Sequence, residues 1–315
     1  MLVASSSRSL PFAIRNPALL ELLVPFVVAT PDNLPALDLA PFGVAPAVHI
    51  DPLRAGSQGF LDLLHRLDGL TFGPEGMPMP RWVFYDCSEL PGAIYGFARP
   101  AATLWPAARA LFKVPQGYDG LVPLSMYIAI PMAHRGVWFG HNLASSAPAL
   151  RTAGLSEVDL TGLGSLTKGL ALQAFGVEHF WGATQWDSDA LYIHSKFGAL
   201  RLATAWTPAH SEPATLTYGF DVDTERLRAS MGDPAVQLPR PATEFWVRAG
   251  DHDAMIALQD RIEAGERFVV TGPPRRVDGV QEVPIAHAPT VDAGLGPGLG
   301  SELRVGPGMA AGAGG

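Results

Sequence analysis

Apolar residues recur at helical spacing in three stretches of the chain. Such spacing is typical of amphipathic helices that bury one face. It predicts helices over residues 60–70, 164–175 and 254–265. In the first of these the apolar face is made by Phe60, Leu63, Leu64, Leu67 and Leu70. His65 lies on the flank of that helix, where we expect it to be solvated.

Alternating or β-branched and aromatic runs between turn residues predict strands. Two hairpins are expected first, pairing 81–87 with 92–98 and then 123–132 with 136–146. A single strand is expected over 179–186, with Gly182 in its interior. Residues 201–208 and 214–220 alternate with period two and are expected to pair antiparallel.

This order of elements predicts an α/β (α+β) fold with a mixed, mostly antiparallel central sheet flanked by helices. We expect four parts: a Pro-rich, irregular segment (1–59) packed on the core, a main domain (60–222), a helix-plus-strand extension (223–288), and a Gly/Pro/Ala tail (289–315). The tail has too few apolar side chains to offset the entropy of ordering, so it is expected to be disordered.

Charge and cysteine content narrow the class of protein. The 315 residues carry a net charge of -8 and no basic run, which argues against a nucleic acid or an anionic membrane as partner. Cys87 is the only cysteine, so no disulfide forms within the chain. The apolar stretch around Glu21 and Pro25 is too short to span a bilayer. We therefore expect a soluble, cytoplasmic protein.

A pair of glycines opens the second predicted helix. Gly162 and Gly164 permit positive φ and close approach of a ligand to the backbone. Free amides at a helix N-terminus attract anions, an effect of roughly 0.3–2 kcal/mol from the dipole. A tight structural turn explains the same glycines. Neither a Walker A loop nor a dinucleotide fingerprint is present around them.

A second pattern follows the strand over 179–186. Asp187 or Ser188 is positioned to cap a short helix, Gly198 to end it, and His194 falls at the edge of its apolar face. Together the two stretches resemble the acyl-CoA-binding half of the GNAT superfamily of N-acyltransferases. That family has Q/R-x-x-G-x-G/A at a helix start and later N-x-x-A-x-x-L-Y-x-K-x-G-F. The resemblance covers roughly residues 60–222 and is strongest over 159–200.

The resemblance implies how an acyl-CoA would bind. It places the diphosphate on the turn at the helix start and the pantetheine along the strand over 136–146, which diverges from the strand over 179–186. The implied coenzyme-binding residues are Leu143, Thr161, Gly162, Leu163, Gly164, Ser165 and Asp187. His194 stands where the family has the tyrosine that protonates the leaving thiolate. Asp159 stands where it has Gln or Arg, and like charges about 4 Å apart cost ~1 kcal/mol in water.

Further candidates surround the same strands. His141 is a candidate base for an amine substrate and Asn142 a candidate donor to the acyl carbonyl, although both also suit a strand end. Trp138 and Trp186 would suit an apolar acceptor pocket, although tryptophans are more often core residues. No spacing indicates a metal site, and no G-x-S-x-G elbow indicates a serine hydrolase.

Three hypotheses remain open from the sequence. The first is an acyltransferase that passes an acyl group, most simply acetyl, directly from CoA to a small-molecule or amine acceptor, or to a hydroxyl, in a ternary complex. His194 would be its acid and His141 its base. The second is a catalytically silent module of the same fold that binds a ligand or partner. The third is an unrelated ligand-binding or decarboxylase-type fold in which the glycine match is accidental.

Overall fold

The computed structural model describes residues 14–34, 39, 42–89 and 94–288. The predicted tail (289–315) and the start of the Pro-rich segment lie outside these residues. So does most of the turn expected between 87 and 92. No helix in the described part of the chain is long and apolar enough to cross a membrane.

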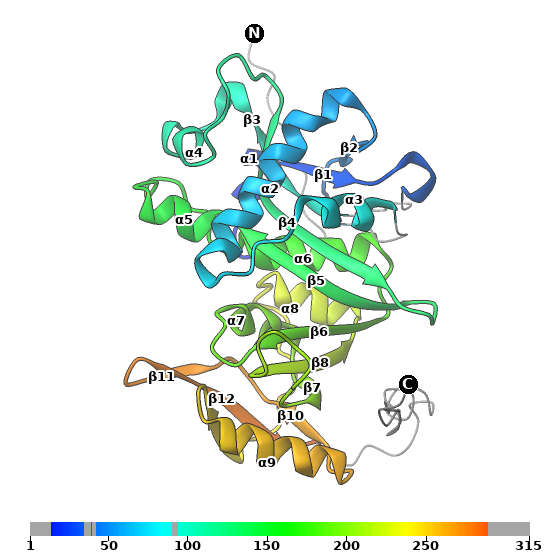
Figure 1. Ribbon diagram of the computed structural model, residues 1–315, viewed down its shortest axis with the longest axis vertical. Coiled ribbons are helices and arrows are strands. Elements are labelled where there is room, and N and C mark those ends of the chain that lie inside the picture. The colour runs from blue at the N-terminus through cyan, green and yellow to red at the C-terminus, as the bar shows by residue number, and fades with distance from the viewer. Residues whose placement is uncertain (1–13, 35–38, 40–41, 90–93, 289–315) are drawn as a thin grey trace, which may run out of the picture.

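The described strands form one mixed, mostly antiparallel sheet of twelve strands, as the pattern predicted (Figure 1). The order across it is β11-β12-β10-β7-β8-β6-β5-β4-β3-β1-β2, with β9 paired to β12. Only β1–β2 and β5–β6 run parallel within this described sheet. The strands are β1 Val24–Val28, β2 Val48–Ile50, β3 Ile94–Pro100, β4 Leu121–Pro131, β5 Val137–Ser145, β6 His179–Gln185, β7 Leu200–Thr204, β8 Thr215–Asp221, β9 Phe245–Arg248, β10 Phe268–Val270, β11 Arg275–Val277 and β12 Val280–His287.

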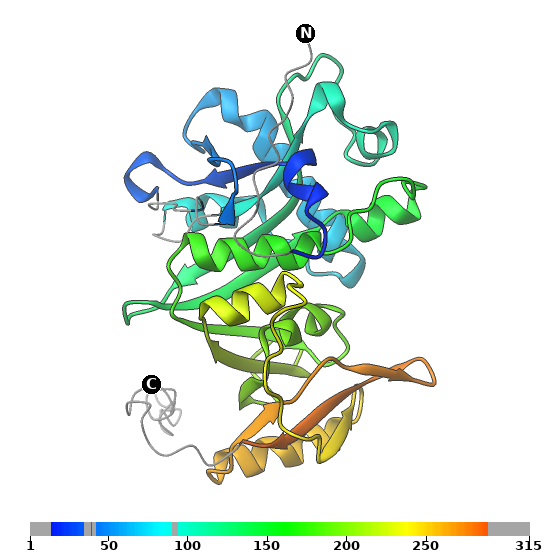
Figure 2. The same ribbon diagram turned by 180° about the vertical axis from the view of Figure 1, so that it is seen from behind.

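Helices cover both faces of this sheet. The α-helices are α1 Ala18–Leu22, α2 Gln58–Phe72, α3 Arg81–Glu89, α4 Pro106–Leu111, α5 Ala147–Thr152, α6 Leu163–Ala174, α7 Ala190–His194, α8 Thr224–Ser230 and α9 His252–Glu263. A 3-10 turn, η6 Ser195–Phe197, continues α7. Helices α2 and α3 lie on one face of the upper sheet, and α6 and α8 lie on the other (Figures 1 and 2). Strand β4 is therefore buried over most of its length.

The prediction of a strand over 81–87 is wrong, because these residues form α3. Phe84, Cys87 and Ser88 are buried on one side, whereas Trp82 and Tyr85 are exposed. The spacing of the buried residues is therefore helical. The aromatic residues, which favoured a strand, lie on both the buried and the exposed side of this helix.

The reading of residues 1–59 as irregular is also wrong where β1 forms. Strand β1 pairs with β3 antiparallel and with β2 parallel, and Phe26, Val27 and Val28 are buried. A short run of apolar residues between prolines is thus a core strand of the sheet. Toward the other edge, β10 pairs with β7, so residues after 222 continue the same sheet.

The remaining predicted elements match the structure. Helices α2, α6 and α9, strands β4 to β6, and the antiparallel pair β7–β8 all lie where the pattern placed them. The sequence reading missed β9, β11 and β12, which complete the sheet beside α9.

Candidate functional site

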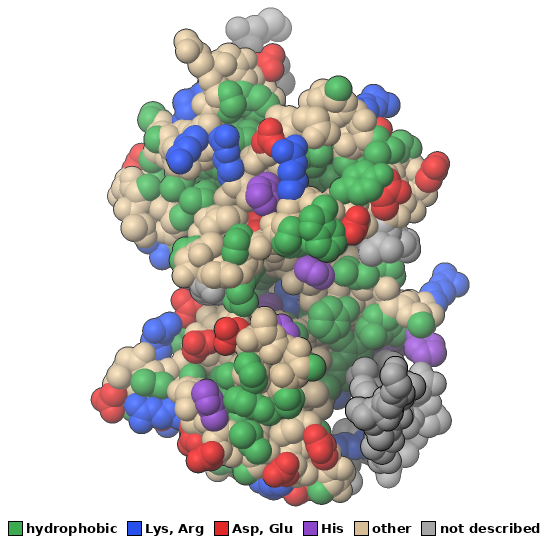
Figure 3. Space-filling view, in the orientation of Figure 1, with side chains coloured by type: hydrophobic (Ala, Val, Ile, Leu, Met, Phe, Trp, Pro, Cys, Tyr) green, Lys and Arg blue, Asp and Glu red, His purple; other side chains and the backbone are tan. Residues whose placement is uncertain are grey.

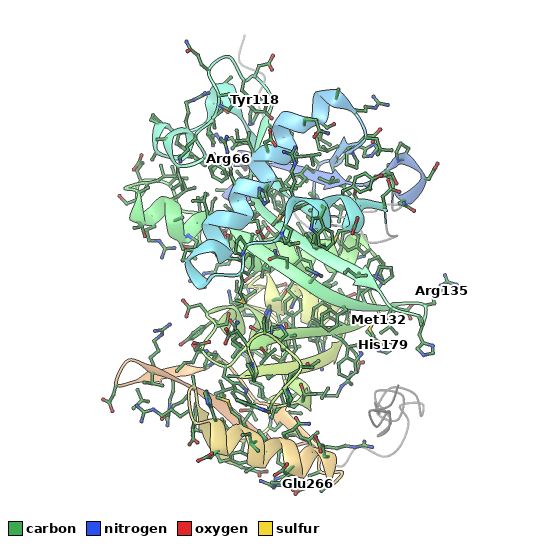
Figure 4. The ribbon with its side chains drawn as sticks, in the orientation of Figure 1. Arg66, Tyr118, Met132, Arg135, His179 and Glu266 are labelled. Atoms are coloured by element: carbon green, nitrogen blue, oxygen red, sulfur yellow. The ribbon has the colours of Figure 1, made fainter. Side chains whose placement is uncertain are left out.

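The parallel strands β5 and β6 separate partway along their length. They pair from Val137–His179 to Gly140–Gly182, and beyond these glycines no pair joins them within the described sheet. The paired end lies on the side where Arg135 and His179 are labelled in Figure 4. The diverging end points the other way, toward α5 and α7 (Figure 1). The molecular surface is hollowed at this level, between the part with α2 and the part with α9 (Figure 3).

A β-bulge in β5 lies at the start of this divergence. Ile128 of β4 pairs with Asn142 and the next residue, Ala129, pairs with Gly140, which leaves His141 as the extra residue. Bulges redirect a side chain and release backbone groups from the ladder. The bulge therefore presents His141 and its backbone at the point where the strands part.

On the α2 face, Asn142 is held by a buried carboxylate. Asp68 of α2 is completely buried and accepts hydrogen bonds from Asn142 Nδ2 (2.7 Å) and from the Met79 amide (2.6 Å). Because the carboxylate accepts from Nδ2, the amide orientation is fixed. Asn142 Oδ1 is buried and has no hydrogen-bond partner among the described residues. The free group of Asn142 is thus an acceptor, which suits an N–H donor and not the acyl carbonyl.

The pKa of His141 depends on the same carboxylate, that of Asp68. Burial raises the pKa of Asp68, while its bonds to Met79 and Asn142 oppose that rise. His141 is exposed at the surface, yet partial burial lowers its pKa, and the charge of Asp68 opposes this by raising it. His141 is therefore a neutral imidazole near neutral pH, the form that accepts a proton. His65 also adjoins Asp68, and its Nε2 lies 3.0 Å from the Met79 carbonyl oxygen, so it is not simply solvated as expected.

Helix α6 begins at the diverging end of the strands. Gly162 has φ +88 and precedes Leu163, and an added Cβ there would meet nothing within 4 Å. The backbone of Gly164 faces Ser145 of β5 and Ile193 of α7. The predicted glycine turn therefore does lie beside the separating strands.

Protein atoms cover part of this helix start. Gly164 and Ser165 are buried, and Lys196 Nζ donates to Ser165 Oγ at 2.8 Å. Asn16 Nδ2 donates to the carbonyl of Asp159 at 2.8 Å, and the Asp159 carboxylate accepts from the Thr161 amide at 2.8 Å. Asp159 is thus engaged by its own turn, which lowers its pKa.

A shallow hollow, with enclosed room for roughly one water molecule, remains at the open side of Gly162. Its lining comes from the chain before α1, the start of α6 and the end of α8: Ile14, Arg15, Asn16, Leu19, Thr161, Gly162, Leu166 and Met231. Burial and the neighbouring charge of Arg15 both lower the pKa of Lys196. Two cationic side chains thus gather near the positive end of a helix dipole, an arrangement that favours an anion.

His194 lies in a buried cluster between α6 and the sheet. Lys168, completely buried on α6, has its Nζ 3.0 Å from His194 Nδ1 and 3.3 Å from Tyr218 Oη. Phe180 and Phe197 place ring centroids 4.2 and 5.0 Å from the same nitrogen. The cluster lies beside the end of the parallel pair, because an added Cβ at Gly182 would lie 3.0 Å from Tyr218 Oη.

Burial sets the protonation states in this cluster. It lowers the pKa of Lys168, and burial and the charge of Lys168 lower the pKa of His194. Aromatic rings attract an ammonium, by roughly 0.5–2 kcal/mol each. No carboxylate in the described part of the chain pairs with Lys168, however, and an unpaired buried ion costs several kcal/mol. Burial therefore favours the neutral forms of both the lysine and the histidine.

The other predicted residues are spread more widely. Trp138 stacks on Phe175 with centroids 5.3 Å apart, and Trp186 is buried with its Nε1 bonded to the Ala205 carbonyl, so neither ring faces an open pocket. Asp187 is exposed, and Ser188 Oγ accepts from the Ala190 amide. Leu143 lies on the diverging part of β5, paired to Tyr127 of β4. No hydrogen bond or ring contact joins His141 to His194 within the described residues.

Sequence reasoning missed two residues of these clusters. Neither Asp68 nor Lys168 was among the candidate site residues predicted from the sequence. The described residues contain no group of three or more His, Cys, Asp or Glu side chains that would hold a metal ion. A scan against protein-family models and a search of curated proteins found no match to this chain.

Proposed function

We propose that this protein is an acyl-CoA-dependent acyltransferase with a GNAT-like fold, which transfers an acyl group to an amine acceptor. The observation that carries the proposal is the parallel pair β5–β6, closed at Gly140–Gly182 and parted beyond, with the start of α6 at its open end. The parting leaves backbone groups of Leu143 free to pair with an extended ligand, as a neighbouring strand would.

The residues at the start of α6 fit a diphosphate by charge. Gly162 offers close approach, and Lys196 and Arg15 supply positive charge. The space does not fit a diphosphate as it stands, because ligand pockets are usually ≈ 300–1,000 Å³ and the enclosed part of the hollow has room for roughly one water molecule. Binding of a whole CoA there requires the side chains of Ile193 and Lys196 to move aside.

Direct transfer assigns a task to each cluster. The acceptor nitrogen attacks the thioester carbonyl, the carbon–sulfur bond breaks, and the departing thiolate accepts a hydrogen bond from the Nε2–H of His194. The nitrogen gives up its own proton to His141, which burial keeps neutral. Backbone N–H groups freed by the bulge at His141 would stabilise the developing oxyanion. Asn142 Oδ1 is held in place by Asp68 and is buried, so it would accept from the acceptor's N–H only after the atoms that cover it move aside.

Calorimetry with CoA and with pantetheine, which lacks the diphosphate, tests the proposal. We expect the wild type to bind CoA. Lys196→Ala should lower the affinity for CoA by about tenfold and leave the affinity for pantetheine unchanged, because a charge-assisted contact to the diphosphate is lost. Arg135→Ala is the matched control, since it removes one positive charge at the far hairpin (Figure 4). Absence of CoA binding at millimolar concentration would refute the proposal.

The burial of Gly164 and Ser165, with Lys196 bonded to Ser165 Oγ, favours a second candidate, a non-catalytic module of the same fold that binds a ligand or partner. The two are separated by turnover with acetyl-CoA and a panel of amines. Saturable turnover that disappears in a folded His194→Gln variant supports the enzyme. If CoA binds but no amine of the panel is acylated, the result supports the non-catalytic module.

A further inference from the structure

Lys168 is the most unusual side chain of the interior. It is completely buried on α6, a helix whose side chains are buried around almost its whole circumference. A lysine on a helix surface normally extends its amine to water. Here the amine points inward, to His194 Nδ1 at 3.0 Å and Tyr218 Oη at 3.3 Å.

We propose that Lys168 is a positioning residue for His194: its amine donates to Nδ1 and holds the imidazole in the tautomer that carries its proton on Nε2. The proposal rests on the proposed function only for the use of that N–H group, which donates a hydrogen bond to the leaving thiolate. The tautomer itself is a property of the protein without substrate.

The 3.0 Å contact identifies the two partners, Lys168 Nζ and His194 Nδ1, and its direction follows the histidine tautomer. A neutral lysine amine has two N–H groups and one lone pair, so it can donate to Nδ1 or accept from it. We assign donation, as for the neighbouring contact in which the amine donates to Tyr218 Oη. Donation to Nδ1 uses the lone pair of that nitrogen, and the ring proton then lies on Nε2. No described residue accepts a hydrogen bond from Nε2, and the residue keeps 6% of its surface exposed.

No other group in the cluster performs this task. The titratable side chains around the imidazole are Lys168 of α6 and Tyr218 of β8, with Tyr127 of β4 beyond them, its ring centroid 5.7 Å from Lys168 Nζ. The hydrogen bond to the second ring nitrogen normally sets a histidine tautomer, and the usual partner is a carboxylate or a carbonyl. The described surroundings of His194 offer neither, so the lysine occupies that place.

Long-range ¹H–¹⁵N spectra of the ¹⁵N-histidine-labelled full chain test the tautomer directly. His194 is assigned by the signal that disappears in His194→Gln. We expect a single tautomer in the wild type at neutral pH, with Nε2 protonated and Nδ1 bare. A proton on Nδ1 in the wild type would overturn the proposal, whatever the chain catalyses.

Two variants test the role of the lysine. Lys168→Met keeps an unbranched chain in the aromatic cage, and we expect averaged shifts from mixed tautomers. Tyr218→Phe removes the second partner of the amine but leaves the bond to Nδ1, so the single tautomer should persist. An unchanged His194 signal in folded Lys168→Met contradicts the proposal. If Lys168→Met does not fold, the wild-type and Tyr218→Phe spectra still decide it.

A kinetic comparison separates this inference from the proposed function. If the chain is an acyltransferase, Lys168→Met should lower kcat by about tenfold or more and change KM for the acyl-CoA by less than about twofold. A lowered kcat with an unchanged tautomer in the variant would refute the positioning role. Failure of all turnover, with the expected spectra, would refute only the acyltransferase.

Discussion

At the scale of single residues, the candidate site requires a glycine at position 140, because no side chain fits there. An added Cβ would overlap Tyr127 Oη and lie 2.5 Å from Phe180 Cζ, and both rings are buried. We expect Gly140→Ala to lower the free energy of unfolding by about 1–3 kcal/mol, because core rings must move. Urea denaturation measures this change.

The control for Gly140 is Gly69→Ala in the interior of α2, where an added Cβ meets nothing within 4 Å. Its gain in helix propensity should leave stability equal or raise it by roughly 0.5–1 kcal/mol. Equal losses in the two variants would mean that the contacts around Gly140 do not limit the site.

Asp68 makes a prediction about pH. Burial raises its pKa in the folded protein, so between the unfolded pKa and this higher value the native state binds more protons. The free energy of unfolding therefore decreases as pH rises from the unfolded pKa through the folded pKa of Asp68. Asp68→Asn cannot ionise, so this decrease should be absent in the variant. The stability of the variant relative to the wild type should increase as pH rises from about 4 to 7. A constant difference across that range would contradict the raised pKa.

Only some features of single residues could be predicted from the sequence. The turn at Gly162 could be predicted because only glycine adopts its φ of +88 without strain. The burial of Lys168 was also predictable, because its helix has no polar face on which a lysine could lie. The partner of Asn142 was not predictable, because Asp68 lies 74 residues earlier in the chain and the contact depends on how α2 packs on β5.

At the scale of elements, helix α9 has the clearest local prediction. Asp251 accepts a hydrogen bond from the Ala254 amide at 3.0 Å as its N-cap, whereas Asp253 lies in the first turn. Asp251→Ala should lower stability by about 0.5–2 kcal/mol. Hydrogen exchange at the Ala254 amide should also become faster.

Asp253→Ala is the matched control for this cap, because it loses only the dipole contribution of roughly 0.3–1 kcal/mol. If the two variants exchange alike at Ala254, the side-chain cap does not stabilise the helix.

Elements with a long, regular pattern were predictable and short ones were not. Helix α6 and strands β4 and β5 have enough residues for their period to be unambiguous. Over 81–87, in contrast, aromatic residues outweighed a helical spacing that spans only two turns. Strand β1 was not predicted because prolines mark loops, and one of them, Pro25, lies within the strand. Its pairing with β2 and β3 overrides that local signal.

At the scale of the whole molecule, the C-terminal region supports the candidate site from a distance. Arg226 NH1 donates to the Phe197 carbonyl at 2.8 Å, and Arg240 NH2 donates to the Ser195 carbonyl at 2.7 Å. Both carbonyls lie in η6, directly after His194. The boundary placed at 222 from composition therefore crosses contacts that hold the end of α7.

Arg240 tests this long-range support, because it joins two elements that the sequence alone does not connect. Its NH1 donates to the Thr271 carbonyl at 3.0 Å while NH2 holds Ser195, so one guanidinium bridges the end of β10 to η6. Arg240→Lys keeps the charge but cannot span both carbonyls. We expect amides of residues 190–198 to exchange about tenfold faster, which corresponds to the loss of one hydrogen bond to a charged group. Arg248→Lys, an exposed position on β9, is the control and should leave them unchanged. If the exchange of α7 and η6 is the same in both variants, the C-terminal strands extend the sheet without stabilising the helix that carries His194.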